Sequence, residues 1–214
     1  LGSLSLENMT KIKYLKKNEI EKKLNFKFDE KNLIITFHPE TLGNTDLVQK
    51  IDNVLNSIGR LKKTKIIFTM PNVDMGNMDI YKKLNNFVKK NKSKSILIKS
   101  MGQRLYFSTL KYIDVVIGNS SSGIIEVPSF RIPTINLGKR QAGRLKSISV
   151  IDSSFSKKDF EKNLKKSLSK KFNQKIKIMK NPYYKKNTIN KMIKILKKIK
   201  FNKGTEKKFY EKKN

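Results

Sequence analysis

The sequence contains no cysteine among its 214 residues, and it holds a single histidine, His38. The absence of cysteine excludes disulfide bonds, thiolate zinc sites and cysteine nucleophiles. No run of 18 apolar residues occurs along the chain, so we expect no membrane-spanning helix. A chain without cysteine and without an apolar span fits a cytoplasmic location, which we expect here.

Arginine is also scarce. Only five of the 49 basic residues are arginines, although the formal net charge is +32. Nucleic-acid interfaces rely on arginine for bidentate contacts that lysine does not make in the same way. The abundance of lysine, asparagine and isoleucine is instead what an AT-rich genome supplies. We therefore interpret the charge as a solvated lysine surface. Weak adhesion to polyanions is the second interpretation, and specific nucleic-acid binding is the least favoured.

Apolar segments with strand character alternate with amphipathic segments of helical spacing. This alternation predicts an α/β fold, with a Rossmann-like parallel sheet covered by helices on both faces. A chain of 214 residues can bury one good core. The expected strands are Leu33–Phe37, Lys65–Met70, Ser95–Ile98, Val115–Ile117, Thr134–Leu137 and Ser149–Ile151. The expected helices are Asn18–Leu24 (with Asn18 as its cap), Asp46–Ile58, Asp79–Lys90, Gln103–Ile113, Lys157–Ser169 and Thr188–Ile199. Residues 201–214 have little to bury, and we expect a disordered basic tail there.

The stretch from Asp114 to Glu126 is the most informative part of the chain. It predicts a buried strand, a turn of small residues and the start of a helix. Ser120, Ser121 and Gly123 let backbone N–H groups approach a ligand closely, as a diphosphate site requires. Glu126, expected in the first helical turn, is placed to accept hydrogen bonds from the two hydroxyls of a ribose. The alternative is a serine-rich helix cap with a glutamate that is stabilised by the helix dipole.

Four candidate residues lie at or just past the ends of expected strands. They are His38, Asn72, Met101 and Ser120. In parallel sheets ligands bind beyond the carboxyl ends of the strands. One edge of the sheet would therefore gather all four residues. This convergence favours a binding site without reference to any family.

Three sequence blocks carry a resemblance to a known family. They are Thr36–Thr41, Met70–Gly76 and Gly118–Arg144, in this order. Together they resemble the hydrolysing UDP-N-acetylglucosamine 2-epimerases of bacterial sialic-acid pathways, and the resemblance runs from about Gly2 to about Ile195. It implies a GT-B fold with two Rossmann-like halves and a cleft between them. We expect residues 1–9 to be an interdomain linker and residues 10–200 to be the C-terminal, UDP-binding domain. Because the chain starts with Leu1, we expect an N-terminal domain to be missing.

The resemblance also implies the roles of individual residues. His38 would face the phosphates of the nucleotide sugar and help the diphosphate leave, and Arg140 would contact the nucleotide. Asn72 would also lie at the nucleotide, and backbone groups of Met101 and Gly102 would hold the uracil. Ser120, Ser121 and Gly123 would bind the diphosphate, and Glu126 the ribose. We expect no bound metal, because Asp74 has no second carboxylate at a useful spacing and the family's chemistry does not require a metal. We expect no cofactor either. Tyr106 and Phe107 are expected in the core.

By the same resemblance, the complete enzyme would eliminate UDP from UDP-N-acetylglucosamine and add water to the resulting glycal-like intermediate. The products would be N-acetylmannosamine and UDP. The acid and base groups would come from the N-terminal half, and the full-length protein would be a homo-oligomer. Three alternatives stay open. The substrate could be UDP-N,N′-diacetylbacillosamine, the protein could be a GT-B glycosyltransferase, or it could be a basic nucleic-acid-binding module.

Overall fold

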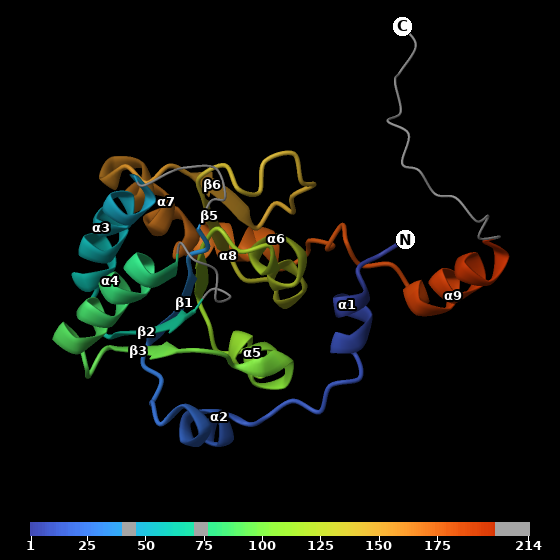
Figure 1. Ribbon diagram of the computed structural model, residues 1–214, viewed down its shortest axis with the longest axis horizontal. Coiled ribbons are helices and arrows are strands. Elements are labelled where there is room, and N and C mark those ends of the chain that lie inside the picture. Colours follow the sequence, from blue (N-terminus) through green and yellow to red (C-terminus); the bar gives the residue numbers. More distant parts are fainter. Residues whose placement is uncertain (40–45, 71–76, 200–214) are drawn as a thin grey trace, which may run out of the picture.

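A six-stranded, all-parallel sheet forms the centre of the protein (Figure 1). The computed structural model describes residues 1–39, 46–70 and 77–199. Within these ranges the strand order is β3-β2-β1-β4-β5-β6. The strands are β1 (Lys31–Thr36), β2 (Thr64–Thr69), β3 (Ser95–Ile98), β4 (Val115–Gly118), β5 (Thr134–Leu137) and β6 (Val150–Ser153).

Both faces of the sheet are buried, which explains why its strands are almost continuously apolar. In β1, Leu33 and Ile35 belong to one hydrophobic cluster, and Ile34 between them belongs to the other. This is the alternation that a strand produces when successive side chains point to opposite faces. The predicted strands therefore exist, with ends that differ from the expected ones by up to two residues.

Helices cover both faces, as predicted. Helices α3, α4 and α7 supply side chains to the cluster that contains Leu33 and Ile35. Helices α1 and α5 and the 3₁₀ turn η1 supply side chains to the cluster that contains Ile34. The helical elements are α1 (Leu4–Met9), α2 (Lys17–Leu24), α3 (Asp46–Gly59), α4 (Asn77–Lys90), α5 (Gly102–Leu110), α6 (Ser122–Ile125), η1 (Val127–Phe130), α7 (Lys157–Ser167), α8 (Lys170–Ile176) and α9 (Thr188–Lys198). The α/β, Rossmann-like fold class is confirmed.

Three local expectations need correction. Helix α2 has Lys16 at its N-cap position rather than Asn18, whose side chain instead accepts the N–H of Glu19 at 2.9 Å. The expected helix 157–169 ends at Ser167, because Ser169 caps a separate helix, α8, by accepting the N–H of Phe172. The helix after the serine turn is a single turn, so Glu126 lies at its C-terminal end rather than in its first turn.

Helices α1 and α9, the first and last of the described chain, contact each other on one side of the molecule (Figure 1). Residues 4–9, expected as part of a linker, form helix α1, and its Leu6 and Met9 are buried. Helix α9 packs beside α1 but leaves Ile193, Leu196 and Ile199 exposed. The tail expected at 201–214 lies outside the described residues. In the part that is described, no helix is long and apolar enough to cross a membrane.

Candidate functional site

The carboxyl edge of the sheet brings together three of the four residues that follow expected strand ends. His38 follows β1, Met101 follows β3 and Ser120 follows β4. Asn72 lies outside the described residues. Strands β1 and β4 are neighbours, although three helices and two strands separate them in the chain. Such a position, where the strand order reverses, is where Rossmann-like sheets bind their ligands.

A glycine lets β4 and β1 end side by side. Gly118 has a φ of +133°, and a Cβ atom placed on it would lie 1.9 Å from the carbonyl oxygen of Thr36. The N–H of the next residue, Asn119, donates to that same oxygen at 3.2 Å. Any side chain at Gly118 would therefore push the start of the serine turn away from β1.

Asn119 links the ends of β1 and β4 and was not among the predicted site residues. Its side chain accepts the N–H of His38 at 2.7 Å and donates to the His38 carbonyl at 2.8 Å. Its own carbonyl accepts Arg140 Nη1 at 3.1 Å and Gln141 Nε2 at 2.9 Å. Asn119 is completely buried. It therefore holds His38, Arg140 and the serine turn in one fixed arrangement. A polar residue directly after a buried strand is the signal that could have found it.

The serine turn presents hydrogen-bond donors that the rest of the described chain leaves unused. The backbone N–H groups of Ser120 and Ser121 have no partner among the described residues. Ser121 occupies the N-cap position of α6, but its side chain makes no capping hydrogen bond. The alternative of a serine-rich helix cap therefore fails to account for the Ser121 hydroxyl.

A cavity of about 410 Å³ opens beside this turn. Four of the predicted residues line it, namely Met101, Gly102, Ser121 and Glu126. Gly102 adopts a left-handed conformation, with φ at +60°. The remaining lining residues come from the ends of β2 and β3, from α5, from α6 and from α1: Thr69, Met70, Lys99, Ser100, Gln103, Tyr106, Phe107, Ser122 and Ser5.

Glu126 contributes a partly buried carboxylate to this cavity. Burial raises the pKa of Glu126 above its ordinary value, and hydrogen bonds from the Ser5 and Ser122 hydroxyls oppose that rise. Ser5 Oγ donates to Glu126 Oε1 at 2.7 Å. Ser5 lies in the segment that was expected to be a linker, and nothing in the local sequence marks it as a site residue.

Tyr106 and Phe107 belong to the apolar cluster around Ile34, as predicted. Phe107 is almost completely buried. The Tyr106 hydroxyl lies 2.9 Å from Ser122 Oγ, and burial raises the pKa of Tyr106 to about 12. At neutral pH Tyr106 is therefore a neutral phenol that forms part of the cavity wall.

Four of the predicted residues that the structure describes lie outside the wall of this cavity, namely His38, Ser120, Gly123 and Arg140. A Cβ atom on Gly123 would lie 2.7 Å from Thr134 Cγ2, so the glycine allows α6 to pack on β5. Arg140 is exposed and reaches the turn only through the carbonyl of Asn119. Direct contact of any of the predicted residues with a nucleotide stays a prediction.

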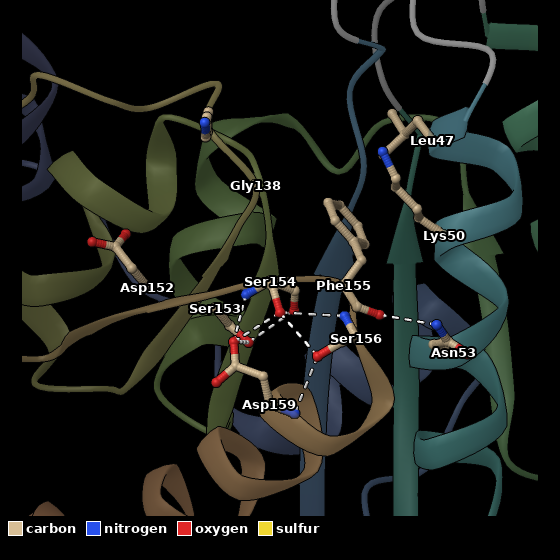
Figure 2. Close-up of a pocket in the computed structure, with 11 residues that line it drawn as sticks. Leu47, Lys50, Asn53, Gly138, Asp152, Ser153, Ser154, Phe155, Ser156 and Asp159 are labelled. Atoms are coloured by element: carbon tan, nitrogen blue, oxygen red, sulfur yellow. Dashed lines mark hydrogen bonds between the residues drawn. The ribbon is translucent and has the colours of Figure 1, made fainter.

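A larger cavity, of about 790 Å³, lies further along the same edge (Figure 2). Its wall includes Lys139 and residues at the start of α3 and α7. There Asp159 accepts the N–H of Ser154 at 2.7 Å and the Ser154 hydroxyl at 2.9 Å. These bonds hold the pKa of Asp159 below its ordinary value. None of the predicted site residues lines this cavity, and its serines already have partners within the loop.

Comparisons with known proteins identify a family and agree with the fold. A family profile described as UDP-N-acetylglucosamine 2-epimerase matches residues 1–197. GDP/UDP-N,N′-diacetylbacillosamine 2-epimerase (hydrolyzing) of Campylobacter jejuni is 37% identical over 81% of this chain and 45% of its own length. Polysialic acid biosynthesis protein P7 of Escherichia coli is 35% identical over 92% of this chain and 50% of its own length.

Among solved structures, the S. aureus MnaA–UDP co-structure superposes with a TM-score of 0.66 at 15% identity. The match covers 92% of this chain and 53% of that one. Identity this low supports the fold alone. The chain spans about half the length of the curated relatives it matches.

Proposed function

Because the chain belongs to the UDP-N-acetylglucosamine 2-epimerase family, we propose that it is the nucleotide-binding half of a hydrolysing UDP-sugar 2-epimerase. The complete enzyme would convert UDP-N-acetylglucosamine into N-acetylmannosamine and UDP, in the biosynthesis of sialic-acid-type sugars. We assign this half the task of holding UDP and stabilising it as it leaves.

One observation carries this proposal. The N–H groups of Ser120 and Ser121, which have no partner among the described residues, lie within seven residues of the Glu126 carboxylate, and Ser121 and Glu126 line one cavity. N–H donors match the oxygens of a diphosphate, and a carboxylate matches the vicinal hydroxyls of a ribose. The wall beyond Glu126 includes Met101 and Gly102, whose backbone groups would then meet the uracil.

His38 and Arg140 would act on the departing diphosphate. The side chain of Asn119 holds the backbone of His38, and its carbonyl holds Arg140, so both residues are tied to the serine turn. Positive charge near the phosphates stabilises the negative charge that grows there as the sugar–oxygen bond breaks. Asn72, which lies outside the described residues, would contact the nucleotide, and Gly123 would complete the diphosphate turn.

The chemistry at C2 of the sugar needs a proton acceptor and a proton donor. Within the described part of the chain, Glu126 is the one carboxylate that lines the 410 Å³ cavity. The proposal assigns Glu126 to the ribose, which leaves no carboxylate pair for the sugar among the described residues that line this cavity. As the family resemblance implies, we expect the acid and base groups to come from the N-terminal half of the enzyme.

A second candidate substrate is UDP-N,N′-diacetylbacillosamine. The C. jejuni relative, 37% identical, carries that sugar in its name, whereas the E. coli relative, 35% identical, is named for polysialic acid biosynthesis. The two identities are too similar to choose between the sugars. A full-length enzyme that contains this chain should be assayed with both nucleotide sugars, and the larger kcat/KM identifies the substrate.

Calorimetric titration of the 214-residue chain with UDP tests the proposed binding role. We expect Glu126→Ala to weaken binding by roughly 1.5–3 kcal/mol for each hydrogen bond that is lost to the ribose.

Ser121→Asp should nearly abolish UDP binding, because it sets a fixed negative charge against the diphosphate. Asp79→Ala is the matched control, since Asp79 is an exposed carboxylate on α4 that contacts only Lys82 among the contacts described.

Two results would contradict the proposal. Equal UDP affinity in Ser121→Asp and in the unaltered chain would exclude the serine turn as a diphosphate site. Release of N-acetylmannosamine from UDP-N-acetylglucosamine by the 214-residue chain alone would show that the acid and base groups lie within it.

A further inference from the structure

Helix α1 places a hydroxyl group on the carboxylate that would bind the ribose. Ser5 Oγ donates to Glu126 Oε1 at 2.7 Å, across 121 positions of sequence. Ser3 Oγ lies 2.8 Å from Ser5 Oγ. Ser5 also lines the 410 Å³ cavity beside Glu126. The contact therefore belongs to the site and not to a distant surface.

The direction of these hydrogen bonds follows from counting protons. A serine hydroxyl has one proton, and an ionised carboxylate can only accept. Ser5 donates its single hydroxyl proton to Glu126, so Ser3 must be the donor in its hydrogen bond with Ser5. The resulting chain, from Ser3 to Ser5 to Glu126, is polarised toward the carboxylate, and hydrogen bonds to a charged group are stronger than neutral ones.

The position of Ser5 is fixed from outside the site. The N–H of Ser3 donates to the carbonyl of Tyr183 at 2.9 Å, and Glu7 Oε2 accepts the N–H of Ile189 at 2.8 Å. On the same helix, the buried side chains of Leu6 and Met9 pack into the core. Helix α1 is thus held by the segment that leads into α9 and by the sheet. Ser5 has a defined place from which it can orient Glu126.

We propose that Ser5 is a positioning residue that holds one oxygen of Glu126 in place, so that the carboxylate meets the ribose hydroxyls in a single orientation. The inference rests on the proposed UDP-binding function and deepens it. Preference for a ribonucleotide over a 2′-deoxyribonucleotide then depends on a residue of α1 as well as on Glu126. Removing the Ser5 hydroxyl leaves Glu126 with the Ser122 hydroxyl as its remaining described side-chain donor, so the carboxylate is held less firmly and the 2′-hydroxyl meets a less well oriented acceptor.

The experiment compares UDP with 2′-deoxy-UDP in calorimetric titrations of the 214-residue chain and of Ser5→Ala. We expect Ser5→Ala to weaken UDP binding about 5- to 10-fold, the range of one hydrogen bond to a charged group reduced by the indirect effect. Binding of 2′-deoxy-UDP should weaken by a smaller factor than binding of UDP, because this nucleotide keeps only the 3′-hydroxyl of the two ribose groups that meet Glu126. Ser3→Ala is the matched control. It removes a hydroxyl from the same segment, but this hydroxyl contacts Ser5 and not Glu126.

A second measurement needs no nucleotide. Titration of the Glu126 carboxyl by carbon-13 NMR should show a higher pKa in Ser5→Ala than in the unaltered chain, because the charged form loses a donor. The Ser3→Ala variant should raise it by less. Among the described residues that line the cavity with Glu126, the other ionisable side chains are Lys99 and Tyr106, and the Tyr106 pKa of about 12 keeps that phenol neutral throughout.

The outcomes separate this inference from the function on which it rests. If the unaltered chain does not bind UDP, the proposed function fails, and the NMR titration still decides whether Ser5 acts on Glu126. Equal loss of UDP and 2′-deoxy-UDP binding in Ser5→Ala would show that Ser5 supports the pocket in general and would overturn the positioning role. An unchanged Glu126 pKa in that variant would overturn it as well.

Discussion

At the residue scale, the site depends on glycine positions where the addition of a single Cβ atom would change the structure. Gly118 lies where a Cβ atom would overlap the Thr36 carbonyl, whereas Gly102 shares the left-handed backbone but has open space around it. Substitutions at the two glycines therefore separate two contributions to the loss of stability. One is the strain of a side chain on a left-handed backbone, and the other is a collision with a neighbouring strand.

Gly118→Ala should lower the free energy of unfolding by more than about 3 kcal/mol, since it combines backbone strain with a clash that must displace β1 or β4. Gly102→Ala should cost about 1–2 kcal/mol, the price of the left-handed conformation alone. Urea denaturation of both variants measures the difference. Similar values for the two would mean that β1 and β4 can move apart without cost, and that the close approach is not needed.

Two carboxylates should give opposite dependences of stability on pH. Burial raises the pKa of Glu126, so its contribution to stability is complete below the ordinary glutamate value and is lost as the pH rises through the higher folded pKa. Glu126→Gln should therefore be more stable than the unaltered chain at neutral pH, and this advantage should shrink on acidification. A gain in stability together with weaker UDP binding would mark Glu126 as a functional residue.

Asp159 is the comparison for that pH series. Hydrogen bonds from the N–H and hydroxyl of Ser154 lower its pKa, so its contribution is present above the ordinary aspartate value and is lost as the pH falls through the lower folded pKa. Asp159→Asn should be less stable at neutral pH, and the deficit should vanish in acid. Urea midpoints measured between about pH 3 and pH 7 test both signs. Parallel curves for the two variants would contradict the assignment.

At the scale of elements, α7 and α9 are both amphipathic, but only α7 buries its apolar side. Leu164 of α7 is 5% exposed and belongs to the cluster around Leu33, whereas Leu196 of α9 is 57% exposed. Helix α9 is held mainly at its N-terminal end, where Thr188 is buried. The amphipathic pattern of a helix therefore does not reveal whether its apolar side has a partner.

Replacing each leucine by alanine should show this contrast directly. Leu164→Ala should cost about 2–5 kcal/mol, because it leaves a cavity in the core. Leu196→Ala should change the free energy of unfolding by no more than about 0.5 kcal/mol in the 214-residue chain. Chemical denaturation gives both values. A large loss for Leu196→Ala would mean that α9 packs more tightly in solution than the structure shows.

At the scale of the whole molecule, the dominant feature is the net charge of +32. Most of the charge is lysine, and the described ion pairs, such as Lys63–Glu30 and Lys82–Asp79, are exposed to solvent. Exposed pairs of this kind contribute little to stability. The excess lysines repel one another in the compact state, so the charge destabilises the fold without defining it.

Moderate salt should therefore stabilise the protein. Between about 10 mM and 150 mM ionic strength the Debye length falls from about 30 Å to about 8 Å, which screens most repulsion between surface lysines. We expect the urea midpoint to rise over this range with sodium chloride. Potassium chloride serves as the control, because a charge effect should not depend on the cation. A midpoint that falls with salt would show that the few acidic partners outweigh the repulsion.

The sequence alone determined the strands of the sheet, the serine turn, and the fact that the residues after several strands gather at one edge of the sheet. Apolar strand segments such as Leu33–Phe37 need only local periodicity to be recognised, and parallel strands must end at a common edge. That is why the positions of His38, Met101 and Ser120 at one edge could be predicted. The family blocks added the nucleotide roles of single residues, which stay predictions, and the family match confirms the resemblance on which they rest.

Only the tertiary structure decided how the turn is held. Asn119 bonds to His38 across 81 positions, Gly123 faces Thr134 of a different strand, and Ser5 reaches Glu126 across 121 positions. Local periodicity reports which side of an element is apolar, but it does not report which distant residue comes to lie against it. The exposed side of α9 and the partly buried hydroxyl contact of α1 follow from the path of the chain through space, and that path is set by the packing of all the elements together.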